Sequence, residues 1–376
     1  MQVPSEVDES GKSARSRMDP RHQEGSTALL VLIAGTLMGT LGVAAFWAAP
    51  YGLHDFSVFY REGLAWNQGV PLYSGHYRLN LNPPLLTVAV FAPVAHLPYT
   101  GAKIVWLLLN TACISLAVMV IGHELRRTPL QMAISLTAML VTQGAFMAIR
   151  SGQITWLLLA PLTLAWAYYR HDRPIAAGVC VGVCVAIKPP LALMALLLPW
   201  QTLLTAGAVS AGLSLGGIAV TGLGPWLAWS RLGSEVTWLG SPANASLWGA
   251  AARLRSGGVS GSIHELPVGV IVAVSLVALW LGWITVRERD RDRRFLRATL
   301  WSLLVSPLGW AYYLPLVWGA ATATWRSRSI RVGYAIALLP VAFNPPGLNL
   351  LPVSIFLVAV LCAWIPPFHA TREPEP

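Results

Sequence analysis

The segment HDFSVFYREGLAWNQGVPLYSGHYRLNLNPP occupies residues 54–84 and directly follows the first long apolar stretch of the chain, residues 27–49. That stretch contains no charged side chain, and as an α-helix it is long enough to cross a hydrocarbon core of about 30 Å. The quoted segment instead combines charged, polar and aromatic side chains, which favours a position in water at the end of a membrane helix. We therefore interpret residues 50–83 as a functional loop outside the membrane.

Composition places the rest of the chain in a membrane as well. Of the 376 residues, 55% are hydrophobic and only 11% are charged, which is more apolar surface than one soluble core can bury. The sequence therefore predicts an all-α polytopic membrane protein. Some of its further apolar stretches are shorter than the roughly 20 residues of a full crossing. The complete set of further apolar stretches, short and long, lies at 84–97, 101–121, 130–149, 152–169, 175–187, 190–200, 202–222, 268–286, 298–305, 310–325, 331–343 and 351–367.

Short apolar stretches are joined at three places by breaks that contain proline. These are IKPP at 187–190, VSPLG at 305–309 and FNPP at 343–346. Broken helices at membrane depth are tolerated only where they face protein or a water-filled cavity. We therefore expect the three breaks to line a polar cavity.

The arginine-rich segments predict the orientation. They lie at 126–127, 170–173, 287–297 and 326–331, and the positive-inside rule puts them in the cytoplasm with both termini. This arrangement requires residues 84–97 to dip into the membrane without crossing it. The loops 50–83 and 223–267, the turn 150–153 and the three breaks then share the extracytoplasmic face. The high ratio of arginine to lysine is typical of a GC-rich bacterial genome, so we expect a bacterial plasma membrane.

Several function classes are excluded by pattern. The net charge of +10 is scattered over short linkers and forms no basic stripe, so no nucleic acid partner is expected. The four cysteines lie inside apolar stretches, and no His/Cys set has metal spacing, so neither a metal site nor a cofactor is expected. The chain also lacks a glycine-rich phosphate loop and a nucleotide-sugar domain. Any activated donor is therefore expected to be lipid-linked.

Asp55 is the leading candidate for catalysis. Of the carboxylates, only Asp55, Glu62, Glu235 and Glu265 fall on the extracytoplasmic side, and Asp55 comes soonest after the first helix. A carboxylate there can accept the proton of an attacking hydroxyl. The alternative is that Asp55 is only a helix N-cap before the apolar stripe of Phe56 and Phe59. Glu62, beside Arg61, is expected to form a solvated or interfacial pair.

Lys188 is the second candidate, because it lies between two apolar stretches at a proline break. An ionisable residue in that position is functional by default, and a lysine suits a phosphate as a point charge. The alternative is a side chain that snorkels to the interface. Arg150, just before Ser151-Gly152-Gln153, is a candidate for the same phosphate, or else an interfacial arginine that ends a helix.

A series of motifs runs along the chain: Asp55, Gly69 to Tyr73, Tyr77 to Pro84, Pro93 to Pro98, Ser151 to Ile154, Ala186 to Pro189, Asn244 to Leu247 and Ser306 to Trp310. Their order and spacing resemble glycosyltransferase family 87 over roughly residues 27–365. The resemblance implies the C-type glycosyltransferase fold, with about 10–13 membrane helices and an essential acid in the first extracytoplasmic loop. It also implies transfer from a polyprenyl-phosphate sugar, because characterised members include mannosyltransferases that use such donors.

Carried over to this sequence, the resemblance assigns the acid to Asp55 and the donor phosphate to Lys188. The family's Ser-Trp-x-His-His element corresponds to residues 309–313, GWAYY, so tyrosines stand where the family has two histidines. A tyrosine offers a neutral hydroxyl and a stacking face in place of an imidazole. The full set of predicted site residues is Asp55 for catalysis, Lys188, Arg150, Tyr312 and Tyr313 for the donor phosphate, and Tyr60, Tyr77, Asn82, Gln153, Asn244, Ser306 and Trp310 for substrate.

The sequence thus predicts inverting transfer of a hexose, mannose first, to a glycolipid acceptor at the extracytoplasmic face. Two alternatives remain: a pentosyl (arabinosyl) transferase with a similar lipid donor, and a lipid or solute transporter, for which broken helices are equally natural. No clear internal repeat supports the transporter. The expected organisation is a disordered cytoplasmic tail (1–26), one transmembrane domain (27–367) with loops 50–83 and 223–267, and a cytoplasmic tail (368–376).

Overall fold

The computed structural model describes residues 35, 53–73, 80–234, 238–241, 243–256, 261–333, 335 and 362–365. Every regular element in this part of the chain is a helix, and strand-like pairing is limited to two isolated bridges. The prediction of an all-α polytopic membrane protein is confirmed. Several predicted features lie outside the described residues, namely the tails 1–26 and 368–376, the first helix 27–49 apart from Gly35, Tyr77, Glu235 and the break at 343–346.

Three described helices are long and apolar enough to cross a membrane: α5 (Tyr99–Leu125), α11 (Trp200–Thr221) and α14 (Val268–Arg287). α11 and α14 leave large apolar side chains exposed, among them Leu215 at 65% and Leu279 at 67%. Apolar surface of this extent is stable when lipid covers it.

The apolar stretch 130–149 forms two helices where the sequence predicted one. α6 (Pro129–Leu140) and α7 (Gln143–Ser151) meet at an angle of 72°. The break has a local cause, because the Thr142 side chain accepts a hydrogen bond from the backbone N–H of Ala145 and so starts a new helix.

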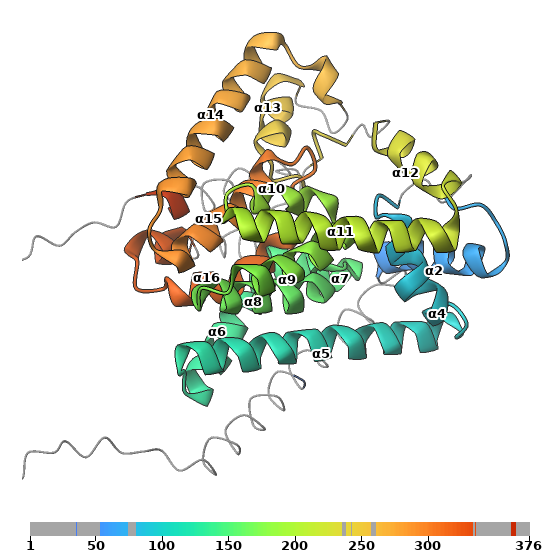
Figure 1. Cartoon of the computed structure of the whole chain (residues 1–376), viewed down its shortest axis with the longest axis horizontal. Coiled ribbons are helices and arrows are strands. Elements are labelled where there is room, and N and C mark those ends of the chain that lie inside the picture. Colours follow the sequence, from blue (N-terminus) through green and yellow to red (C-terminus); the bar gives the residue numbers. More distant parts are fainter. Residues whose placement is uncertain are drawn as a thin grey trace, which may run out of the picture.

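The helices α8 (Thr155–Arg170) and α9 (Pro174–Ile187) form the centre of the molecule between α5 and α11. α5 packs on α8, α8 on α9 and α9 on α11, and Figure 1 shows these helices stacked in that order. Close approach of α9 to α11 depends on two glycines. A Cβ on Gly178 or Gly182 would lie 2.8 Å from a backbone carbonyl oxygen of α11.

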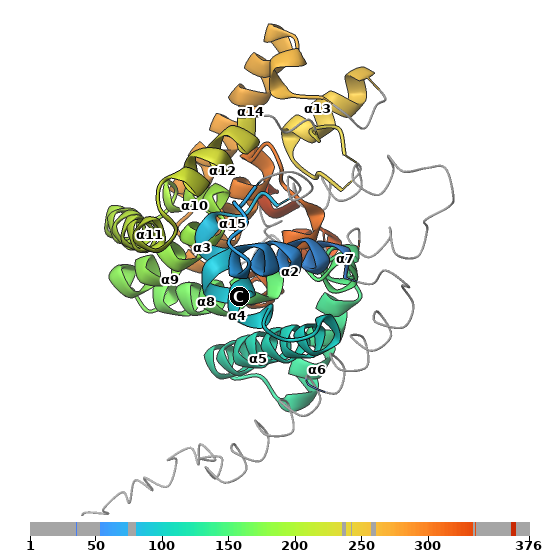
Figure 2. The ribbon, with the colours of Figure 1, turned by 90° about the vertical axis from the view of Figure 1, so that its right-hand side faces the viewer.

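Residues 84–94 are too short to cross the membrane. They comprise α3 (Pro84–Leu86), the π-helical turn η2 (Thr87–Phe91) and α4 (Ala92–Val94). A full crossing needs roughly 20 residues, so this length fits the predicted dip. The loop helix α2 (His54–Asn67) packs on η2 and α4, and Figure 2 shows it passing beside α7.

The two predicted breaks within the described residues are confirmed. α9 ends at Ile187 before η3 (Pro189–Leu191) and α10 (Ala192–Ala195). α15 (Arg291–Val305) ends before Ser306, and the chain continues as η5 (Ala311–Val317) and α16 (Trp318–Ala323). Proline lacks the backbone N–H of a helix interior and disfavours helical geometry in the residue before it, which explains why both helices stop there.

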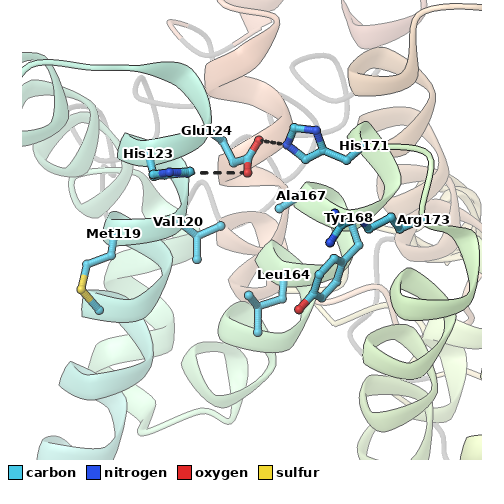
Figure 3. Close-up of a pocket in the computed structure, with 9 residues that line it drawn as sticks. All are labelled: Met119, Val120, His123, Glu124, Leu164, Ala167, Tyr168, His171 and Arg173. Atoms are coloured by element: carbon cyan, nitrogen blue, oxygen red, sulfur yellow. Dashed lines mark hydrogen bonds and ion pairs between the residues drawn. The ribbon is translucent and has the colours of Figure 1, made fainter. Parts of the chain in front are cut away.

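Three of the arginine-rich segments gather at one end of the helices. Arg291 pairs with Asp172 at 2.9 Å, Arg170 with Asp292 at 3.3 Å, and His171 with Glu124 at 2.8 Å. Figure 3 shows Glu124 between His123 and His171 at the edge of a pocket formed by α5 and α8. This clustering agrees with the predicted placement of these segments on one side.

The arginine-rich segment 287–297 is not a simple linker. Its second half is the first turns of α15, which starts after the Asp290 side chain accepts a hydrogen bond from the backbone of Arg293. Arg297 is only 4% exposed. It pairs with Glu288 at 2.8 Å and donates to the Ala363 carbonyl, at η6 (Cys362–Trp364). These partners allow the charged Arg297 side chain to be buried.

The remaining helices lie on the side of α11 away from α5. α12 (Gly224–Ser234) contacts α11 and α3, while α13 (Leu247–Ser256) contacts α14 and α15. The short η4 (Ile263–Glu265) leads into α14. In both views α13 and α14 rise together from the stacked helices.

Candidate active site

Asp55 lies in the first turn of α2, with its side chain partly exposed at 32%. The helix begins at His54 after Leu53, whose left-handed backbone has a φ of 69°, and no side chain caps it. The alternative that Asp55 is the N-cap is therefore wrong. Its carboxylate accepts a hydrogen bond from Gln153 Nε2 and lies 3.5 Å from His54 Nδ1. Asp55 is thus oriented but still accessible.

The turn that carries Gln153 is packed directly on α2. The backbone N–H of Leu53 donates to the Arg150 carbonyl at 3.2 Å. Gly152 has a φ of +70°, and a Cβ there would lie 2.7 Å from the Phe56 Cβ, so a glycine is required for both backbone and space. Arg150 itself is exposed at the end of α7 and touches α2 through its carbonyl.

Lys188 lies at the break after α9 with a non-helical backbone, φ −138° and ψ 86°. Its Nζ is 5.3 Å from the ring centroid of Tyr313, which is a cation–π distance. The Asp55 carboxylate is near enough to interact electrostatically with Lys188, Tyr312 and Tyr313. Together with Gln153, which bonds Asp55, these residues come from four distant segments that the sequence singled out separately.

Four aromatic rings extend this cluster, and we refer to Trp238, Trp310, Tyr312 and Tyr313 as the aromatic ladder. Ring centroids are 6.5 Å apart for Trp238 and Trp310 and 5.7 Å for Trp310 and Tyr312, whose planes are stacked. Tyr312 and Tyr313 meet edge to face at 4.8 Å. The Thr155 hydroxyl donates to the Tyr312 carbonyl at 2.9 Å and fixes this segment to α8.

Asn244 braces the segment that carries the aromatic ladder. It is fully buried, and its Nδ2 donates to the carbonyls of Leu239 and Pro307 at 2.9 and 2.8 Å. Backbone hydrogen bonds join Ala245 to Gly309 and Ala311 to Ala243 beside it. The amide nitrogen of Asn244 donates to two backbone carbonyls, so Asn244 supports this segment. Its predicted substrate contact stays a prediction.

The other predicted substrate residues are arranged around this centre. Ser306 is 1% exposed at the break after α15, and its hydroxyl has no partner among the described residues. Tyr60 donates to the Leu97 carbonyl at 2.9 Å, below α2. Asn82 is 4% exposed, and its carbonyl accepts from the Tyr73 hydroxyl at 2.6 Å. Neither Tyr60 nor Asn82 is joined to Asp55 by a described contact.

The prediction that Glu62 is solvated is wrong. Its side chain is 0% exposed, and Oε2 accepts hydrogen bonds from Asn80 Nδ2 and from the Thr87 hydroxyl, the latter at 3.2 Å. Burial raises the pKa of the Glu62 carboxyl to about 7, although the hydrogen bonds from Asn80 and Thr87 oppose that rise. The neighbouring Arg61 misled the sequence interpretation, because adjacent residues of a helix do not face each other.

The raised pKa of Glu62 predicts a stability that falls with pH. A carboxyl that binds its proton more tightly in the folded state stabilises fully below its unfolded pKa, near 4.5, and this stabilisation is lost as pH rises through about 7. The shift corresponds to on the order of 3 kcal/mol of unfolding free energy. We expect the melting temperature of Glu62→Gln, followed by tryptophan fluorescence in detergent, to exceed that of wild type at pH 8 but not at pH 4.5. A constant difference at both pH values would contradict this expectation.

Comparison with known proteins supports one family. Residues 80–308 match the model of glycosyltransferase family 87. An alpha-(1->3)-arabinofuranosyltransferase of Mycobacterium tuberculosis, strain H37Rv, is 26% identical over 283 residues, which cover 69% of this chain and 63% of that protein. The alpha-(1->3)-arabinofuranosyltransferase of strain CDC 1551 matches with the same values. No solved structure is a significant match.

Proposed function

The chain belongs to glycosyltransferase family 87, and from this premise we propose that it transfers a sugar from a polyprenyl-phosphate donor to a glycolipid acceptor. The protein is a membrane glycosyltransferase. The proposal adds the lipid donor, the acceptor, the catalytic and binding residues, and the extracytoplasmic location of the site. It treats residues 27–367 as one catalytic domain in a bacterial plasma membrane.

The observation that carries this proposal is the presence of a carboxylate, Asp55, and an ammonium, Lys188, near enough to interact electrostatically, with the Tyr313 ring beside the ammonium. The carboxylate is partly exposed and held by Gln153, while the ammonium lies 5.3 Å from the Tyr313 ring and within electrostatic reach of Asp55. An oxocarbenium-like transition state carries positive charge on the sugar and negative charge on the departing phosphate. A base on one side and a cation on the other are the two groups that this charge distribution needs.

The transfer is a single displacement. The acceptor hydroxyl gives its proton to the Asp55 carboxylate, and its oxygen forms a bond to the anomeric carbon. The bond from that carbon to the phosphate oxygen breaks, and polyprenyl phosphate leaves with the electron pair, stabilised by Lys188. One displacement inverts the configuration at the anomeric carbon. The stacked faces of Trp310 and Tyr312 offer a platform for the sugar ring.

Two sugars are candidates. The relatives named alpha-(1->3)-arabinofuranosyltransferases favour a pentofuranose, so we place arabinofuranose first and mannose, the sugar expected from the family resemblance, second. The tyrosine pair at 312–313 is consistent with a changed donor site, because it replaces two imidazoles with neutral hydroxyls beside Lys188.

A donor panel tests this proposal. In membrane vesicles that contain the full chain, we expect transfer to endogenous glycolipid from decaprenyl-phosphate arabinose, with an inverted anomeric linkage by NMR of the product. Vesicles without the protein are the control. If only polyprenyl-phosphate mannose supports transfer, mannose and not arabinofuranose is the donor sugar. Transfer from a nucleotide sugar, or retention of configuration, would overturn the proposal.

A further inference from the structure

Glu62 is a buried carboxylate that the proposed reaction does not use. It follows Asp55 by seven residues on α2, so the two side chains leave the helix on the same face about 10 Å apart along its axis. Yet Glu62 is completely shielded from solvent and Asp55 is not. The two acids on this helix therefore cannot share one role.

Among the described residues, Glu62 is surrounded by hydrogen-bond donors and forms no ion pair. Asn80 and Thr87 both donate to Oε2, and Asn80 Nδ2 lies 3.5 Å from the Thr87 hydroxyl. Oε1 has no side-chain partner among the described residues. Burying a carboxyl costs free energy, and its hydrogen bonds offset part of that cost. Here they join α2 to η2, the turn that carries Thr87.

This contact lies in the middle of a close interface. Asn67 Nδ2 donates to the Ala92 carbonyl at 2.8 Å, and the Tyr60 hydroxyl donates to the Leu97 carbonyl. Between them, a Cβ on Gly63 would lie 2.4 Å from the Phe91 carbonyl oxygen. One end of α2 is therefore fixed on residues 80–97, and Glu62 is the group that links both Asn80 and Thr87 to it.

The other end of α2 carries the proposed base. Leu53 and Asp55 are bonded to Arg150 and Gln153, and Phe56 packs on Gly152. α2 is thus a helix held at one end by residues 80–97 and at the other end by the turn 150–153. A change in its tilt at Glu62 moves the Asp55 carboxylate relative to Lys188, and a misplacement of about 1 Å can cost on the order of a hundredfold in rate.

We propose that Glu62 is a positioning residue for the transfer reaction, whose hydrogen bonds to Asn80 and Thr87 set the tilt of α2 and hence the place of the Asp55 carboxylate. This inference rests on the proposed role of Asp55 as the base. The amide of a glutamine retains an oxygen that accepts from both donors, whereas an alanine retains none. Hydrogen bonding, and not negative charge, is the required property.

The test compares kcat and KM of the full chain in vesicles with decaprenyl-phosphate arabinose or polyprenyl-phosphate mannose as donor. We expect Glu62→Ala to lower kcat at least tenfold with KM for the donor within threefold of wild type, because Lys188 and the aromatic ladder are not on α2. Glu62→Gln should stay within about threefold in both constants. Glu124→Gln, a hydrogen-bonded carboxylate at the arginine-rich end, is the matched control and should equal wild type.

A second pair of variants, at Thr87, tests the same hydrogen bonds in case Glu62→Ala misfolds. Thr87→Val removes one donor with little change in volume and should lower kcat, whereas Thr87→Ser keeps the hydroxyl and should restore it. Wild-type kcat in Glu62→Ala, or a Glu62→Gln variant as inactive as Glu62→Ala, would overturn the positioning role. In an Asp55→Asn background, Glu62→Ala should cause no further loss. If Asp55→Asn alone remains active, the base assignment fails; if it is inactive while Glu62→Ala is active, only the positioning role fails.

Discussion

Replacing Asp55 by asparagine is expected to lower kcat for sugar transfer about a thousandfold, within the range of general base catalysis. The substitution keeps the shape of the side chain and an oxygen that accepts from Gln153 Nε2, so the fold around it should not change. What it removes is the ability to take the proton of the acceptor hydroxyl. The measurement is single-turnover transfer in vesicles with saturating lipid donor.

The melting temperature of Asp55→Asn separates chemistry from folding. Because Asp55 is partly exposed and in the first turn of α2, we expect a melting temperature within a few degrees of wild type. His54→Ala, which alters the other neighbour of the carboxylate, should leave kcat within tenfold. Near-wild-type transfer by Asp55→Asn would remove Asp55 as the base.

Replacing Lys188 by glutamine is expected to lower kcat/KM about a hundredfold, the usual cost of losing one group that stabilises developing negative charge. The leaving phosphate gains charge as the sugar bond breaks, so most of the loss should appear in kcat. Arginine retains a cation that can lie over the Tyr313 ring. We therefore expect Lys188→Arg to recover part of the activity.

The chain offers a matched control for this substitution. Lys103 Nζ lies 4.8 Å from the ring centroid of Tyr99, the same type of contact as between Lys188 and Tyr313. Lys103→Gln should change kcat/KM by less than threefold, because this lysine is not part of the proposed site. Equal losses in the two glutamine variants would mean that Lys188 acts only through packing or membrane anchoring.

In the proposed phosphate site, tyrosines stand where the family resemblance implies two histidines. Tyr313 is buried under Lys188, and Tyr312 is stacked on Trp310. A neutral tyrosine ring supplies no positive charge, but its face attracts an ammonium and can keep it in a fixed place. In the proposed site, Lys188 therefore supplies the positive charge and Tyr313 helps to orient it.

Local sequence determined the class of this protein and where its helices stop. An apolar composition fixes membrane residence, and the prolines after Lys188 and Ser306 end α9 and α15, because a missing backbone N–H acts on neighbouring residues whatever the surroundings. The stretch 130–149 was the exception, since the cap at Thr142 broke a pattern that hydrophobicity alone leaves continuous.

Only the tertiary structure decided which polar residues face water and which face each other. Glu62 and Arg297 have sequence neighbours typical of solvated charges, yet both are buried by partners outside their own helices. Gln153 reaches Asp55 across 98 residues, and the Thr155 hydroxyl reaches the Tyr312 carbonyl across 157. A hydrogen bond depends on atoms within about 3 Å, and no local pattern encodes which distant segments will come that close. The sequence of residues 54–84 indicated the loop, whereas folding decided that Asp55 contacts Gln153 and that Glu62 is enclosed.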